Sequence, residues 1–143
     1  MLLEHWRLWL RALWIEDDEL MLGLIRAIDD HALRRQRGVS LAFASTLREA
    51  EDILRRERFD VVVLDLGLPD CRDPEILLTR ICWAGSHRIV LVSGSGRVHE
   101  VAAEARRIGV AQLRTSVFKG KLPMDEFQRS PRKFHEWIEE MAA

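Results

Sequence analysis

The chain contains no tyrosine, although five tryptophans and five phenylalanines occur among its 143 residues. Its two cysteines, Cys71 and Cys82, are too few for a disulfide framework or a zinc site and suit a reducing compartment. A formal net charge of −1 gives no electrostatic excess for binding nucleic acid or membranes. Near the amino terminus the longest uninterrupted apolar run is Ala12 to Ile15, too short for a secretory signal or a spanning helix. We therefore expect a soluble, cytoplasmic protein with no direct role on nucleic acid.

What is present is typical of one globular domain, with 48% apolar and 31% charged residues. Short apolar runs alternate with longer segments of helical periodicity, which predicts an α/β fold with a parallel sheet covered on both faces. The run at 60–66 is apolar without alternation apart from its acids, as in a strand buried on both faces. The five predicted strands are 11–15, 39–44, 60–66, 88–93 and 113–118.

The helical segments between these strands carry recognisable ends. Thr46 and Glu49 form a capping-box pattern, and a final amphipathic helix follows Pro131. The polar stretch before Pro131 is assigned to no helix or strand. Trp83 and Trp137 are predicted to pack on the helix faces that cover the sheet.

We divide the chain into an N-terminal extension, 1–10, and one domain, 11–143. The extension contributes to a stripe with helical spacing, formed by Leu2, Trp6, Trp9 and Leu13. Two interpretations stay open: the stripe covers the domain's own surface, or it contacts a partner or a second copy of the chain.

Polar side chains stand at the carboxyl ends of four predicted strands, where open parallel sheets place their sites. Since Ile15 is the last apolar residue of the first strand, Glu16 and Asp17 belong to the site and Asp18 is predicted to cap the next helix. The remaining three are Asp65, Ser93 and Lys119. Carboxylates of this kind suit a hard divalent cation such as Mg²⁺, and the lysine suits a phosphoryl group.

Four motifs in this order resemble the response-regulator receiver domains (CheY-like superfamily) of two-component signalling. They are W-I-E-D-D, V-V-V-L-D-L-G-L-P-D, L-V-S-G-S and V-F-K-G, and the resemblance covers roughly residues 11 to 142. The resemblance implies a flavodoxin-like, doubly wound five-stranded parallel sheet with strand order 2-1-3-4-5. It also implies that Asp65 accepts a phosphoryl group from a histidine kinase or phosphotransfer protein and thereby switches a surface for a downstream protein.

The same resemblance assigns the other site residues. Ser93 and Lys119 would contact the phosphoryl oxygens, and Pro69 would rigidify the loop beside the acceptor. Magnesium would be held by Glu16, Asp17, Asp65 and the backbone carbonyl of Gly67.

The chain departs from the family pattern around the lysine. Ser116 stands where the family usually has an aromatic residue, often tyrosine, and Gly120 stands where it usually has a cis proline. Phe118 is predicted to point to the opposite side of its strand from Ser116. Lys121 is a second lysine close to the expected position.

Three functions remain open. The first is a phosphorylated receiver, a signalling module rather than an enzyme, with only self-catalysed phosphorylation and dephosphorylation; it could form a homodimer. The second is a degenerate receiver that binds proteins without phosphorylation. The third is a phosphatase of the haloacid dehalogenase type, which is disfavoured because Gly67 occupies the place of the second aspartate of its D-x-D motif.

Overall fold

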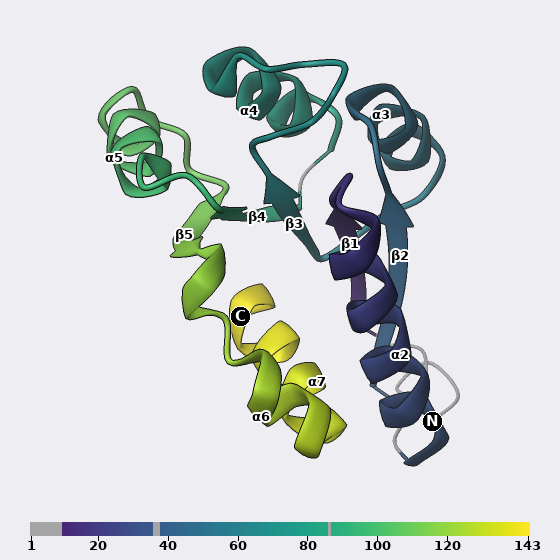
Figure 1. Cartoon of the computed structure of the whole chain (residues 1–143). Helices are drawn as coiled ribbons and strands as arrows, with labels where there is room; N and C mark the ends of the chain where they lie inside the picture. The colour runs from purple at the N-terminus through teal and green to yellow at the C-terminus, as the bar shows by residue number, and fades with distance from the viewer. Residues whose placement is uncertain (1–9, 36–37, 86) are drawn as a thin grey trace.

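Five parallel strands form one sheet in the computed structural model, which describes residues 10–35, 38–85 and 87–143. The strand order is β2-β1-β3-β4-β5, which confirms the predicted order (Figure 1). Residues 1–9 of the N-terminal extension, with Leu2, Trp6 and Trp9, lie outside the described residues, and its last residue, Leu10, begins β1. The strands are β1 (Leu10–Ile15), β2 (Val39–Ala44), β3 (Val61–Asp65), β4 (Arg88–Ser93) and β5 (Leu113–Phe118).

Helices cover both faces of this sheet (Figure 1). One face carries α3 (Leu47–Arg56), α4 (Pro74–Trp83) and α5 (Val98–Arg107), and the other carries α2 (Glu19–Arg35), α6 (Met124–Arg129) and α7 (Pro131–Ala142). A short 3₁₀ turn, Lys119–Lys121, joins β5 to α6. Within the described residues no helix combines the length and apolarity that a membrane span needs.

Helix α6 occupies the polar stretch before Pro131, to which the sequence pattern assigns no helix or strand. Its apolar signal is sparse, because the helix has six residues and only Phe127 is buried. The ring of Phe127 lies 5.3 Å from that of Phe134 and 6.1 Å from that of Trp137. Packing against α7, rather than local pattern, therefore stabilises this helix.

Side-chain oxygens satisfy the first amides of three helices. The Thr46 hydroxyl accepts from the Glu49 amide at 3.1 Å, and one Asp18 oxygen accepts from the amides of Leu20 and Met21. Asp73 caps α4 in the same way, with Pro74 in the first turn, where its missing N–H is not needed. The predicted cap at Asp18 is confirmed, and it leaves Glu16 and Asp17 free of helix capping.

The two tryptophans that we predicted to pack behave differently. Trp137 packs against Trp14, with ring centroids 6.1 Å apart, in the core between the sheet and α7. Trp83, the last residue of α4, is 82% exposed, so the prediction for it is wrong. With 3.6 residues per turn, Trp83 lies on the side of α4 opposite the buried face formed by Leu77, Leu78 and Ile81.

A buried polar pair ties α2 to α7. Nε2 of His135 lies 2.8 Å from Oδ1 of Asp29, and both side chains are almost fully buried. Sequence spacing gave no sign of this contact, because 106 residues separate the two partners. This hydrogen bond satisfies two polar groups, each of which would be costly to bury alone.

Candidate functional site

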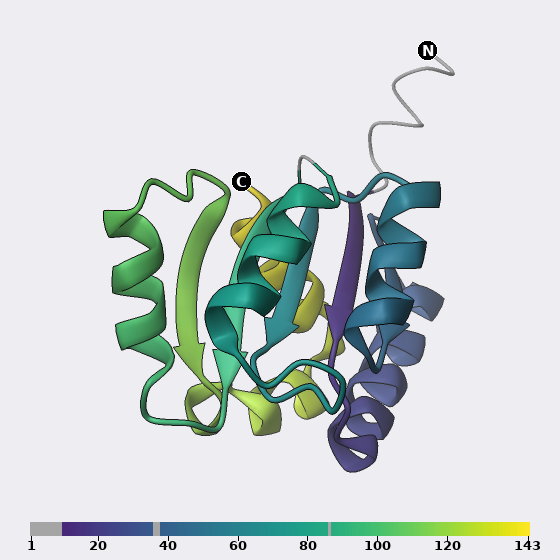
Figure 2. The ribbon, with the colours of Figure 1, turned by 90° about the horizontal axis from the view of Figure 1, so that it is seen from above.

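The carboxyl ends of the strands meet at one edge of the sheet, where the arrowheads converge in Figure 2. The parallel register pairs Ile15 of β1 with Leu64 of β3, so Glu16 follows one strand beside Asp65 at the end of the other. Each strand therefore delivers its polar residue to the same place. The residues predicted from four separate motifs are brought to one edge.

Three carboxylates cluster at this edge. Glu16 is fully buried, Asp65 is 7% exposed, and Asp17 is exposed at the rim. One ligand oxygen from each lies within 4.8 Å of the others. The cluster thus has a buried floor and an open side that faces solvent.

Lys119, the first residue of the 3₁₀ turn directly after β5, closes the cluster. Its ammonium donates to Oε1 of Glu16 at 2.5 Å and to Oδ2 of Asp65 at 3.1 Å. Lys121, two residues later, is exposed and lies in the 3₁₀ turn. Of the two lysines that the sequence offered, the structure places Lys119 against the carboxylates.

Burial and proximity set the protonation of the pair formed by Glu16 and Asp65. Burial raises the pKa of Glu16 to about 8, and the hydrogen bond to Asp65 adds to this, while Lys119 opposes it. Burial also acts to raise the pKa of Asp65, but the hydrogen bond from Glu16, the charge of Lys119 and the Gly67 amide outweigh it, so the pKa of Asp65 is lowered. Of the two carboxyl groups, Glu16 therefore keeps its proton to higher pH.

This proton gives the stability of the metal-free protein a distinct pH dependence. The pKa of Glu16 rises from 4.5 to about 8 on folding. Its contribution to the free energy of unfolding is therefore complete below pH 4.5 and is lost as the pH rises through about 8. When the pH is raised from about 6.5 to about 8.5, we expect the urea concentration at the unfolding midpoint of the wild type to fall. The midpoint of Glu16→Gln should change less over the same range. Burial lowers the pKa of His87 below 6.5, so the stability that depends on His87 is lost as the pH falls below about 6.5, outside this range. Equal slopes in the two proteins would contradict the prediction.

The donor set fits a divalent cation. Oε2 of Glu16 is buried and has no hydrogen-bond partner among the described residues. An unpaired buried carboxylate oxygen is costly, and a hard cation would satisfy it. Asp17 supplies an exposed carboxylate at the same point, which leaves room for water and phosphoryl ligands.

The structure places Gly67 and Ser93 differently relative to Asp65. The Gly67 amide donates to Oδ1 of Asp65 at 3.1 Å, so its backbone lies against the acceptor, and the role of its carbonyl stays a prediction. The Ser93 hydroxyl is almost fully buried at the end of β4 and accepts from the Ser95 amide at 3.1 Å. In the described part of the chain, this hydroxyl therefore bonds to its own loop.

Asp70 braces the loop that follows Asp65, a role that our sequence reasoning missed. Its two carboxylate oxygens accept from the amides of Leu47, at 2.8 Å, and Arg48, at 3.0 Å, at the start of α3. Burial slightly opposes ionisation, but these amide bonds outweigh it and lower the pKa of Asp70. The contact joins two loops 23 residues apart, so no local pattern reveals it.

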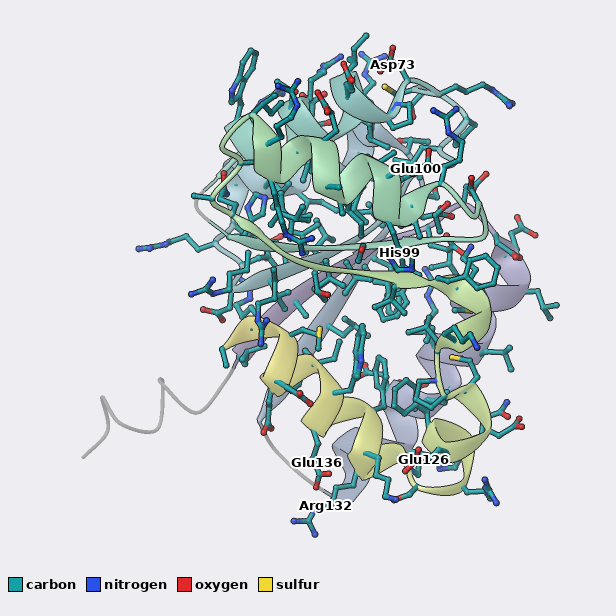
Figure 3. The ribbon with its side chains drawn as sticks, turned by 90° about the vertical axis from the view of Figure 1, so that its left-hand side faces the viewer. Asp73, His99, Glu100, Glu126, Arg132 and Glu136 are labelled. Atoms are coloured by element: carbon teal, nitrogen blue, oxygen red, sulfur yellow. The ribbon has the colours of Figure 1, made fainter. Side chains whose placement is uncertain are left out.

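Ser116 contacts α5 rather than an aromatic partner. Its hydroxyl lies 2.8 Å from Nδ1 of His99, in the first turn of α5 (Figure 3). Phe118 packs in the core on the same side of β5, so our prediction that it points away from Ser116 is wrong. Residues two apart in a strand share a face, and here only Val117 between them faces the α7 side.

Neither the protein-family models nor the curated proteins give any match to this chain. Solved structures do match it, and most of those compared are response-regulator receiver domains. A CheY-like receiver domain from Methanospirillum hungatei JF-1 is 21% identical, with a TM-score of 0.64 over 92% of this chain and 98% of that one. The non-phosphorylated HemR receiver domain from Leptospira biflexa is 24% identical, with a TM-score of 0.64 over 94% of each chain.

A third structure is similar over most of its length. It is a response regulator protein from Burkholderia pseudomallei, solved with a phosphorylated aspartic acid, a calcium ion and citrate. It is 20% identical, with a TM-score of 0.61 over 94% of this chain and 73% of that one. At such identities the likeness establishes the fold: the chain has the flavodoxin-like fold of receiver domains, with strand order 2-1-3-4-5.

Proposed function

We propose that the chain is a receiver module of a two-component phosphorelay, in which Asp65 accepts a phosphoryl group. This proposal rests on the hydrogen bonds of Asp65. One carboxylate oxygen accepts from the Gly67 amide, and the other accepts from the Lys119 ammonium. Phosphoryl transfer depends on positioning and charge neutralisation, and this arrangement supplies both. The fold shared with receiver domains supports the same role.

The chemistry follows from the charge state of Asp65. Its lowered pKa keeps it ionised, so one oxygen can attack the phosphorus of a phosphohistidine donor. The new bond is an acyl phosphate P–O bond, the P–N bond of the donor breaks, and the imidazole leaves with the bonding electrons. Lys119 is positioned to neutralise a phosphoryl oxygen, and we assign Ser93 to contact another.

We further propose that Mg²⁺ is the cofactor, held by Glu16, Asp17, Asp65 and the Gly67 carbonyl. When bound, it would supply positive charge to the phosphoryl oxygens. The calcium ion and phosphorylated aspartic acid of the Burkholderia pseudomallei protein support a cation beside the acceptor. The donor would be a histidine kinase or phosphotransfer protein, and the output a protein contact made without enzymatic turnover.

Acetyl phosphate tests this function without a cognate kinase. We expect the full chain to gain one phosphoryl group, measured by intact-protein mass, when Mg²⁺ is present and not when EDTA replaces it. Hydroxylamine should release the group, because it cleaves acyl phosphates. A chain that never gains the group would contradict the proposal and favour the phosphorylation-independent receiver. Continuous turnover of a generic phosphate ester would instead favour a phosphatase.

A further inference from the structure

Helix α4 exposes large apolar side chains that the acidic site does not use. Trp83 is 82% exposed and Ile76 is 52% exposed. They are seven residues apart, which is close to two turns, so they lie on the same outer side of α4. Ile108, directly after α5, is 61% exposed. Of the four large hydrophobic side chains that the described residues expose to this degree, three therefore lie on neighbouring elements.

A groove of about 470 Å³ lies between α4 and α5. Ile108 lines it, whereas Ile76 and Trp83 lie on the outer side of α4, the helix that forms one of its walls. Its apolar lining includes Leu78 from α4, Val101 and Ala105 from α5, and Ile108 at the end. Leu78 and Ala105 are almost fully buried and belong to the domain core, so the floor of the groove is part of the rigid framework. We call the groove together with Ile76, Trp83 and Ile108 the α4–α5 surface.

The rim of this surface is acidic. The groove is lined by Asp73, Glu75, Glu100 and Glu104 and by Arg97. Arg107 is paired with Glu104, so the rim has an excess of two negative charges. Figure 3 shows Asp73 and Glu100 on the side of the molecule away from α6 and α7, which carry the labelled Glu126 and Glu136. Arg97 contacts Glu100 only at 3.5 Å, and both side chains are exposed.

We propose that the α4–α5 surface binds a basic amphipathic helix of a partner protein. Exposed tryptophan and isoleucine beside a groove supply the apolar anchors of an interface, and the acidic rim selects lysine or arginine around the partner's own apolar side chains. Helix α4 has 10 residues and is about 15 Å long, which matches roughly three turns of a docked helix.

Charge argues against a second copy of the chain as the occupant. In a two-fold dimer the same patch meets itself, so two rims of the same net negative charge would be packed together. Like charges brought together in this way are costly. The partner is therefore a different chain, with charge opposite to that of the rim.

The inference goes beyond the phosphorelay proposal, because none of the residues in the α4–α5 surface belongs to the acidic cluster or contacts Lys119. We expect Asp65→Asn to bind the same peptides as the wild type. Loss of phosphorylation and loss of this binding are then separate results, and failure of one proposal leaves the other standing.

A displayed library of random peptides of about 14 residues, selected on the immobilised full chain, tests the partner chemistry. We expect the enriched peptides to carry lysine or arginine together with apolar residues three and four positions apart. Affinities are then measured by fluorescence anisotropy with one enriched peptide and with its copy in which glutamate replaces each basic residue. The glutamate copy should bind at least about tenfold more weakly.

Variants at exposed positions locate the site without disturbing the core. Ile108→Lys and Trp83→Ala should each weaken binding of the enriched peptide about tenfold or more. The double variant Glu75→Lys with Glu100→Lys should weaken its binding to the same degree. Leu20→Lys is the matched control, because Leu20 is 76% exposed but lies in α2, on the other face of the sheet.

Three results would overturn the proposal. The first is enrichment of peptides that lack the basic amphipathic pattern, or no enrichment at all. The second is equal weakening by Leu20→Lys and Ile108→Lys, which would mean non-specific binding. The third is a wild-type dimer in sedimentation experiments that Ile108→Lys dissociates, because the occupant would then be a second copy of the chain.

Discussion

Replacement of Asp65 by asparagine should abolish phosphoryl incorporation from acetyl phosphate and leave the fold intact. The amide cannot act as the nucleophile that a carboxylate provides. Its carbonyl oxygen can still accept from the Gly67 amide, which bonds to Oδ1 of Asp65 at 3.1 Å in the wild type. Lys119 keeps its bond to Glu16. We therefore expect the free energy of unfolding to change by no more than about 1 kcal/mol.

The measurement combines intact-protein mass after incubation with Mg²⁺ and acetyl phosphate with a urea titration of each protein. Asp30→Asn is the matched control, since Asp30 is an exposed carboxylate in α2, and it should label like the wild type. Full labelling of Asp65→Asn would show that another carboxylate is the acceptor. A variant that is unlabelled but largely unfolded would show that Asp65 has a structural role that the contacts do not indicate.

The sheet and its site edge could be predicted because their signals are local. Each strand is a short apolar run with a polar residue at its end, and parallel strands bring those ends together. Glu16 and Asp65 follow this rule directly, so two strands that are 45 residues apart or more deliver adjacent carboxylates. The sequence did not decide whether Lys119 or Lys121 contacts the carboxylates. Only the path of the chain from β5 into the 3₁₀ turn shows that it is Lys119.

The features that escaped prediction depend on contacts between distant segments. Asp70 is an ordinary loop aspartate until its loop meets the start of α3, and His135 is an isolated histidine until α7 meets Asp29. Trp83 shows the opposite failure. A tryptophan in an amphipathic helix is usually covered, but this one lies on the side of α4 away from the buried residues of that helix.

The aromatic pattern around β5 has a similar explanation. A chain without tyrosine has no phenol to place between β5 and α5, and Ser116 instead bonds to His99 across that interface. Strand alternation should have placed Ser116 and Phe118 on the same face, as the structure does. On the face that carries α5, β5 thus makes a polar contact through Ser116 and an apolar contact through Phe118.

Replacing Lys119 by methionine should separate metal binding from phosphoryl transfer. The ammonium now neutralises Glu16 and Asp65, so it competes with any cation that these carboxylates bind. Its removal should tighten Mg²⁺ binding, because the cluster keeps its negative charges and loses a nearby positive one. Phosphoryl transfer should nevertheless fall on the order of a hundredfold, since a preorganised positive group is lost from the site where charge develops.

The same substitution should destabilise the metal-free protein by about 2 kcal/mol, because it leaves the buried Asp65 carboxylate without its counterion. Glu16 limits the cost, because it is protonated below about pH 8. Mg²⁺ binding by calorimetry, labelling rate and urea midpoint are measured for Lys119→Met and for Lys121→Met. Lys121 is exposed in the same turn, so its variant should resemble the wild type in all three. Weaker Mg²⁺ binding in Lys119→Met would mean that the lysine organises the cluster for the metal rather than competing with it. Unchanged labelling would remove Lys119 from the transfer step and leave it a purely structural counterion.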